Sequence, residues 1–183
     1  MAVDRPRVEA LVRELLVAIG EDPERAGLEQ TPARVAEACA EFFSGIGADA
    51  GAPLERTISV AVLLRDVRFR SVCEHHLLPF VGAAHLAYLP GEHVVGLGAL
   101  PRVVDVLASR PQVQERLGEQ IADVMASRLD ARGVLVVLDA VHGCVTSRGE
   151  RQPASSTLTI AARGALAEPA ARAELIALIA GRA

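Results

Sequence analysis

The feature that most constrains the fold is a nearly unbroken apolar run at residues 134–145, in which Asp139 is the one acidic residue. Such a run is typical of a strand buried on both faces of a sheet or against another subunit. Segments at about residues 58–64, 81–89 and 155–161 also have the character of strands. The alternation of the first segment shifts by one residue near Arg65-Asp66, which predicts a bulge.

Helical segments surround these strands. Apolar residues at positions 8, 11, 12, 15, 16 and 19 have helical spacing, and Thr31-Pro32 predicts the cap and first-turn proline of a second helix ending near Phe43. Residues 101–110 and 111–128 predict two consecutive helices, and residues 168–180 a last one. This order predicts an α+β domain at residues 54–166, with an N-terminal helical segment at 1–53 and a C-terminal helix at 167–183.

Composition excludes several functions. The net charge is -4 and the basic residues, all Arg, form no stripe, which disfavours nucleic acid as a partner. No apolar run reaches the roughly 18 residues of a membrane span, and the first twenty residues lack the pattern of a signal peptide. We therefore expect a cytoplasmic protein whose three Cys form no disulfide framework. Cys39, on the second helix, is expected to be core packing.

Reactive side chains concentrate in two short segments, Cys73-Glu74-His75-His76 and His142-Gly143-Cys144, which hold three of the five His and two of the three Cys. Cys and His are the donors that zinc prefers, and the C-x-x-H spacing lets Cys73 and His76 reach one ion. Cys144 would supply a third ligand. Three protein ligands leave a fourth position for water, which is the arrangement of a catalytic zinc site.

Two further histidines flank this predicted metal site. If the strand continues through Cys144, His142 shares its face, and His75 precedes a ligand; neutral imidazoles there suit proton transfer near pH 7. The alternative is a closed structural site in which His142 or His75 is the fourth ligand. His85 and His93 receive no role. Glu115 is either part of a solvated helix face or a carboxylate that accepts two N–H donors from a guanine edge.

These motifs resemble the GTP cyclohydrolase I family. The resemblance covers about residues 8–165 and rests on segments in the family's order and spacing: Thr31-Pro32-x-Arg34, Cys73 to His76, Gly96-Leu97 with Arg102, Gln112 to Leu117, and His142-x-Cys144-x-x-x-Arg148-Gly149. It implies a tunnelling fold, an antiparallel sheet with two helices on one face. It also implies a homodecamer of two stacked rings with active sites at subunit interfaces.

The resemblance also assigns roles by position. It implies Zn²⁺ ligands at Cys73, His76 and Cys144, and proton-handling histidines at His75 and His142. Glu115, with Gln114 beside it, would recognise guanine, and the phosphate-facing arginines would be Arg34, Arg102, Arg148 and Arg151. The implied reaction adds water at C8 of the guanine of GTP, opens the imidazole ring and releases formate. Rearrangement then yields 7,8-dihydroneopterin triphosphate.

One departure leaves alternatives open. After Gly96-Leu97 the family usually has Ser-Lys near the triphosphate, whereas this chain has Gly98-Ala99. Loss of an ammonium group weakens a charge-assisted phosphate contact. Either the arginines suffice and GTP is the substrate, or the chain is a paralogue for a different or less phosphorylated guanine nucleotide. A non-catalytic, zinc-stabilised nucleotide-binding ring is the alternative from another class.

Overall fold

The computed structural model describes residues 3–48, 61–92, 94–148 and 151–181. A five-stranded sheet, ordered β3-β1-β2-β4-β5, forms its centre. Its long strands are antiparallel neighbours: β1 (Val62–Cys73), β2 (Pro79–Pro90), β4 (Ala131–His142) and β5 (Thr157–Gly164). The short β3 (Pro111–Gln112) pairs in parallel with the end of β1, so the sheet is not wholly antiparallel.

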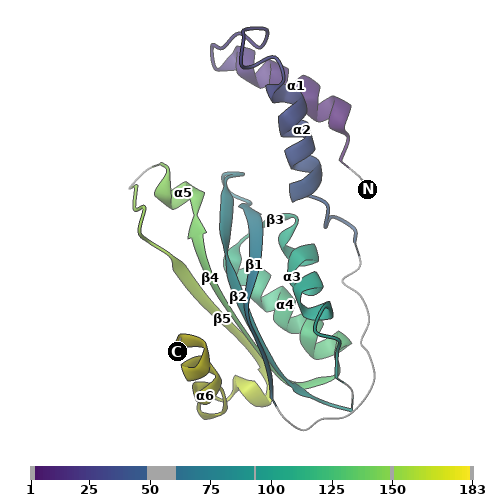
Figure 1. Ribbon diagram of the computed structural model, residues 1–183, viewed down its shortest axis with the longest axis vertical. Coiled ribbons are helices and arrows are strands. Elements are labelled where there is room, and N and C mark those ends of the chain that lie inside the picture. The colour runs from purple at the N-terminus through teal and green to yellow at the C-terminus, as the bar shows by residue number, and fades with distance from the viewer. Residues whose placement is uncertain (1–2, 49–60, 93, 149–150, 182–183) are drawn as a thin grey trace.

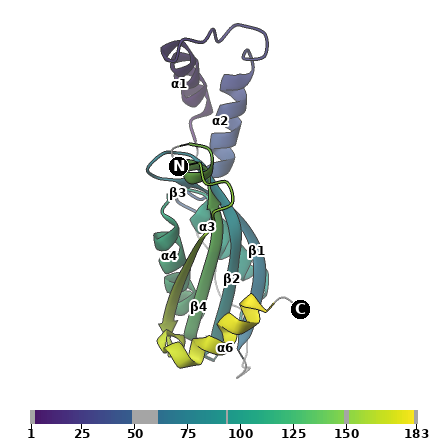
Figure 2. The same ribbon diagram turned by 90° about the vertical axis from the view of Figure 1, so that its left-hand side faces the viewer.

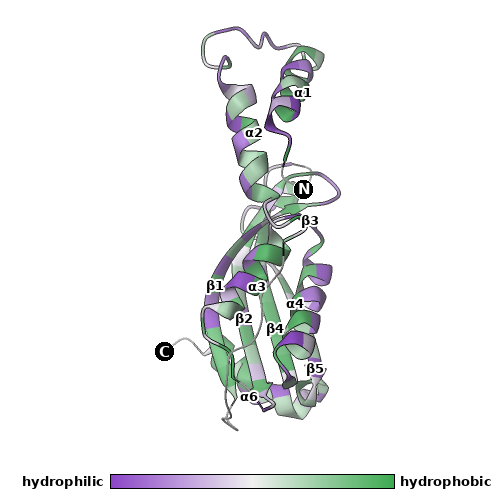
Figure 3. Ribbon diagram, turned by 90° about the vertical axis from the view of Figure 1, so that its right-hand side faces the viewer, coloured by the Kyte–Doolittle hydropathy of each residue, from purple (hydrophilic) through white to green (hydrophobic). Residues whose placement is uncertain are grey.

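Two helices, α3 (Ala99–Ala108) and α4 (Gln114–Arg128), cover one face of the sheet (Figure 1). Their apolar sides meet β2 and β4, which are hydrophobic along most of their length (Figure 3). Leu100, Ile121 and Leu138 are fully buried in this core. The α+β class and the two helices on one face are therefore as the sequence predicts.

The opposite face carries α6 (Pro169–Ala180), which crosses the strands after the short 3-10 helix Ala165–Ala167 (Figure 2). Leu175 of α6 packs with Leu135 and Val137 in a second, smaller core. Apolar side chains beyond α6 stay exposed on this face, among them Leu158 and Ile160. The division of the chain at residues 53/54 and 166/167 stays a prediction.

At the N-terminus, α1 (Arg5–Ala18) and α2 (Thr31–Phe42) pack together and project beyond one end of the sheet (Figure 1). The Asp4 side chain caps α1 by accepting from Arg7 N at 3.1 Å. Thr31 is the first helical residue of α2, not its cap: Gln30 holds the cap position and makes no side-chain capping bond. Within the described residues, no helix is long and apolar enough to span a membrane.

The predicted bulge lies in β1, where the register with β2 shifts between Leu64 and Val67. Asp66 adopts a left-handed backbone with φ 59°, and its N–H donates to Nδ1 of the buried His85 at 3.3 Å. His85, which received no role from the sequence, therefore has a structural one. Ile58 and Val60, the first part of the predicted strand, lie outside the described residues.

Two predicted boundaries are wrong in a way that matters for the site. The helix expected at residues 111–128 begins at Gln114, because Pro111-Gln112 adds to the sheet beside Val72 and Cys73. The strand expected at residues 134–145 ends at His142, and residues Gly143–Thr146 form the short helix α5. A Cβ on Gly143 would lie 2.8 Å from the Pro79 carbonyl oxygen, so only glycine permits this close passage.

Candidate metal centre and active site

The turn between β1 and β2 presents the first two predicted metal ligands. Leu77 N and Cys73 N bond across the turn to Cys73 O and Leu78 O, at 2.8 and 2.9 Å. Leu77 is in the left-handed region with φ 52°, which closes the turn tightly. Cys73 is buried and His76 exposed. The Cys73 Sγ and His76 Nδ1 atoms lie 3.8 Å apart.

Sheet register brings the second segment to the same place. Val72 pairs with Pro79, and the next residue of β2, Phe80, pairs with His142 at the end of β4. Cys144 follows in α5, so the expectation that it shares a strand face with His142 is wrong. Nevertheless, one donor atom from each of Cys73, His76 and Cys144 lies within 4.8 Å of the others. Residues up to 71 positions apart in the chain thus form one candidate metal centre.

The donor chemistry of this group fits zinc. In a tetrahedral site with Zn–S near 2.3 Å and Zn–N near 2.0 Å, donor atoms are roughly 3.5–3.8 Å apart, close to the spacing of Cys73 and His76. Burial, and then the neighbouring Cys73, raise the pKa of the Cys144 thiol. A divalent cation would reverse this effect by favouring both thiolates. Among the described residues the group has three members, which leaves a fourth ligand position.

His142 lies beside this centre in a strongly constrained position. Its ring stacks on the buried Phe80 ring with centroids 4.6 Å apart and planes 6° apart. Its Nε2 is 2.6 Å from Gln114 Oε1. Burial lowers the pKa of His142, with Glu115 opposing the shift, so the neutral imidazole is favoured near pH 7. The sequence contained no sign of the Phe80 or Gln114 contacts.

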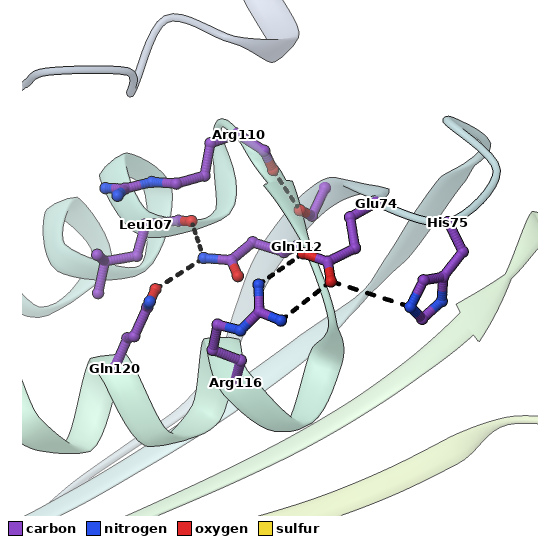
Figure 4. Close-up of polar contacts among 8 residues, drawn as sticks. Glu74, His75, Leu107, Arg110, Gln112, Arg116 and Gln120 are labelled. Atoms are coloured by element: carbon purple, nitrogen blue, oxygen red, sulfur yellow. Dashed lines mark hydrogen bonds and ion pairs between the residues drawn. The ribbon is translucent and has the colours of Figure 1, made fainter.

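An ion pair ties the turn between β1 and β2, called the metal turn below because it carries Cys73 and His76, to the first turn of α4 (Figure 4). Arg116 donates to both carboxylate oxygens of Glu74, at 2.5 and 3.0 Å, and this bonding lowers the pKa of Glu74. Glu74 N also donates to Gln112 O at 3.0 Å. The exposed His75 lies beside the same carboxylate, with Nε2 at 3.9 Å. Sequence reasoning missed this pair because Glu74 and Arg116 lie on separate elements with no shared motif.

Of the predicted substrate-binding residues, two lie near His142 and four are spread over separate parts of the chain. Glu115, next to Gln114 in the first turn of α4, is exposed and acts electrostatically on His142. Gln114 is 1% exposed. The four predicted phosphate-facing arginines are all exposed and lie on separate parts of the chain: Arg34 on α2, Arg102 on α3, and Arg148 and Arg151 after α5. Arg34 donates to Gln30, the cap residue of α2, at 2.9 Å.

The fold and the site together define an α+β protein with a candidate three-ligand Cys/His metal centre and a constrained histidine beside it. The model of the family GTP cyclohydrolase I matches residues 8–180, and the chain belongs to this family. It is 65% identical to "GTP cyclohydrolase 1" of Leifsonia xyli subsp. xyli, over 96% of this chain and 95% of that protein.

Other relatives share the same description. "GTP cyclohydrolase 1" of Rhodopirellula baltica is 52% identical over 97% of this chain and 80% of its own length. The protein of that description from Thermobifida fusca is 50% identical over 98% of this chain and 90% of its own. Among solved structures, an apo archaeosine synthase QueF-Like superposes with a TM-score of 0.47 and 19% identity, covering 60% of this chain and 97% of that one.

Proposed function

We propose that this chain opens the guanine imidazole ring of GTP by hydrolysis, releases formate and forms 7,8-dihydroneopterin triphosphate. The observation that carries the proposal is the convergence of Cys73, His76 and Cys144 beside His142, in a chain of the GTP cyclohydrolase I family. The donor set and the histidine match what hydrolysis of a cyclic amidine needs: an activated water and a group that protonates the leaving nitrogen.

Zinc is the proposed resident metal, held by Cys73, His76 and Cys144. When bound, it supplies Lewis acidity and a water whose pKa is near 7. The engagement of His142 Nε2 with Gln114 argues against that nitrogen as a fourth ligand. Among the described residues, the three-member group contains neither His142 nor His75, which favours the open site over the closed one. Metal analysis of the purified protein tests this assignment and expects one zinc per chain.

The protein's own residues then divide the remaining work. His142, favoured as the neutral imidazole, takes a proton from solvent water and passes it to the guanine ring nitrogen next to C8. The exposed His75 flanks the metal turn and accepts a proton from the attacking water. Glu115 accepts two N–H bonds from the guanine edge, a bidentate pattern that distinguishes guanine from adenine.

The triphosphate is assigned to Arg34, Arg102, Arg148 and Arg151. Their exposure and dispersal within one chain support a site completed by a neighbouring subunit, as in the homodecamer that the family resemblance implies. Size-exclusion chromatography with light scattering tests the assembly. The proposed location is the cytoplasm, where the three free cysteines would remain reduced.

A second candidate substrate, a less phosphorylated guanine nucleotide, is favoured by Gly98 and Ala99 alone. These residues, at the start of α3, stand where the family usually has Ser-Lys. Without the ammonium group, the binding energy from the terminal phosphates is reduced. We favour GTP because the arginines remain.

The test compares formate release from GTP, GDP, GMP and guanosine at equal concentration, using metal-loaded protein and a chelator-treated control. Release that is fastest with GTP, depends on metal and accompanies an oxidisable pterin supports the proposal. Preference for GMP or GDP supports the second candidate instead. No formate from any of the four, with one zinc per chain bound, overturns ring opening and favours the non-catalytic nucleotide-binding ring.

A further inference from the structure

The side chain of Gln114 lies at the contact between α4 and the sheet. It is the first residue of α4 and is 1% exposed. Its Nε2 donates to Leu138 O at 3.1 Å, Thr157 O at 2.8 Å and Thr159 Oγ1 at 3.2 Å. Both hydrogens of the amide group are therefore directed at the backbone and side chains of β4 and β5.

These partners determine which way the amide faces. The backbone carbonyls of Leu138 and Thr157 can only accept hydrogen bonds, so the NH₂ group of Gln114 must point at them. Oε1 then points the other way, where His142 Nε2 lies at 2.6 Å. An amide oxygen can only accept, and therefore His142 Nε2 must carry a hydrogen. In the neutral ring, the lone pair belongs to Nδ1.

A second contact fixes the plane of the same ring. Phe80, fully buried on β2, stacks on His142 with the two planes 6° apart. Stacking constrains the tilt of the imidazole, and the bond to Gln114 constrains its rotation within that plane. No described residue makes a hydrogen bond to His142 Nδ1. This nitrogen is thus the one left for exchange of protons with a substrate.

We infer that Gln114 is a positioning residue that holds His142 as the Nε2–H tautomer and reserves Nδ1 for proton transfer. The inference rests on the proposed function for its consequence, although the tautomer itself does not. During turnover, Nδ1 takes a proton from solvent water and gives it to the guanine ring nitrogen, while the Nε2–H remains bonded to Gln114. This role differs from the substrate contact expected from the sequence, because the buried amide already uses both its donors and its acceptor within the chain.

The chain offers a matched control in Gln112, two residues earlier. Gln112 is also buried, at 2% exposure, but its Nε2 donates to Leu107 O at 3.0 Å and Gln120 Oε1 at 2.8 Å (Figure 4). Gln112→Met and Gln114→Met therefore remove the same amide from similar surroundings. The control amide makes no hydrogen bond to His142.

The first measurement compares steady-state formate release by the two metal-loaded variants and the parent. Gln114→Met is expected to lower kcat by about tenfold to a hundredfold, the usual effect of removing a group that orients a reactive histidine, with KM nearly unchanged. Gln112→Met is expected to keep the parent kcat. A raised KM with the parent kcat in Gln114→Met would mean a substrate contact and overturn the inference.

The second measurement reads the tautomer directly, without substrate. Solid-state ¹⁵N spectra of protein labelled at histidine, with the His142 signals identified by their loss in His142→Ala, distinguish Nε2–H from Nδ1–H. The parent is expected to show Nε2–H, and Gln114→Met a mixture. An Nδ1–H ring in the parent would overturn the inference even if Gln114→Met fails to fold. If the protein releases no formate, the proposed function fails while the tautomer is still measured.

Discussion

The two ends of the candidate site are built differently. At the metal end, side chains from β1, β2, β4, α4 and α5 of one chain meet: the three donor atoms lie within 4.8 Å, and His142 is held by Phe80 and Gln114. At the end proposed to bind the triphosphate, called the phosphate end below, the four arginines are exposed and lie on separate parts of the chain. Among the described residues, Arg102 and Arg148 make no side-chain hydrogen bond or ion pair.

This difference fits the proposed roles of the two ends. Proton transfer and metal binding need fixed geometry, which buried contacts within one chain supply. A triphosphate is highly charged and hydrated, and guanidinium groups bind it well. Burying such groups without a partner before the substrate arrives would be costly, so they are better left exposed to water. We therefore expect substitutions at the metal end to lower turnover, and substitutions at the phosphate end to weaken substrate binding.

The largest effect is expected from loss of a metal ligand. Cys144→Ala should release the metal and reduce formate production to background, because two remaining donors hold zinc poorly. Metal content and formate release are measured together. Cys39→Ala is the control, since this free cysteine lies on α2, away from the three-ligand group. Full metal content and activity in Cys144→Ala would show that the metal end is assembled in another way.

Removing the imidazole of His142 is the next test. His142→Ala should lower kcat by about a hundredfold to ten-thousandfold, the usual contribution of a general acid–base group, while zinc remains bound. The measurement is single-turnover formate release with parallel metal analysis. If zinc is lost with the imidazole, His142 is a fourth ligand and the closed-site alternative gains support.

The ion pair that ties the metal turn to α4 should have an intermediate effect. Arg116→Gln removes the guanidinium that donates two hydrogen bonds to Glu74. We expect kcat to fall about tenfold and metal release to a chelator to accelerate. Arg163→Gln is the matched control. Arg163, on β5, binds Glu119 and Asp123, which lie on α4 like Arg116 but apart from the site. Equal kcat and equal rates of metal release in the two variants would show that the Glu74–Arg116 ion pair does not support the metal end.

Substitutions at the phosphate end should change KM. Arg148→Ala and Arg102→Ala are each expected to raise KM for GTP by about tenfold to a hundredfold, the cost of one hydrogen bond between charged groups. The KM for guanosine, which has no phosphate, should change little. A fall in kcat for both substrates would contradict the division between the two ends.

The smallest effect is expected at the position where this chain departs from its family. Ala99→Lys, at the first residue of α3, should lower KM for GTP by a few-fold, up to about tenfold, because an exposed ammonium pairs weakly in water. Ala99→Gln is the uncharged control. If Ala99→Lys lowers KM for GDP or GMP more than for GTP, the second candidate substrate is favoured.

Local patterns predicted much of this molecule. Helical spacing located α1, the Thr31-Pro32 pair located the start of α2, and the parity change near Asp66 located the bulge in β1. The Cys73, His76 and Cys144 group was predicted from donor chemistry and the family motif, and the three side chains do converge. The roles of Glu115 and the four arginines remain predictions.

Boundaries at the site could not be predicted, since long-range contacts set them. Pro111-Gln112 joins the sheet because β1 offers a free edge, although proline is also typical of a helix start. The strand ends at His142 and α5 begins at Gly143, where the backbone passes so close to the Pro79 carbonyl that a Cβ would not fit. The apolar run in the sequence continues through residue 145, so it predicted a strand three residues too long.

The sequence by itself determined the α+β class and the family, and it located the candidate metal donors, because these depend on periodicity, side-chain chemistry and motif order along the chain. Only the tertiary structure decided how His142 is held and how Glu74 reaches Arg116. Those contacts join residues 28 and 42 positions apart. Hydrogen bonds between such residues depend on register and packing of whole elements, which no local pattern encodes.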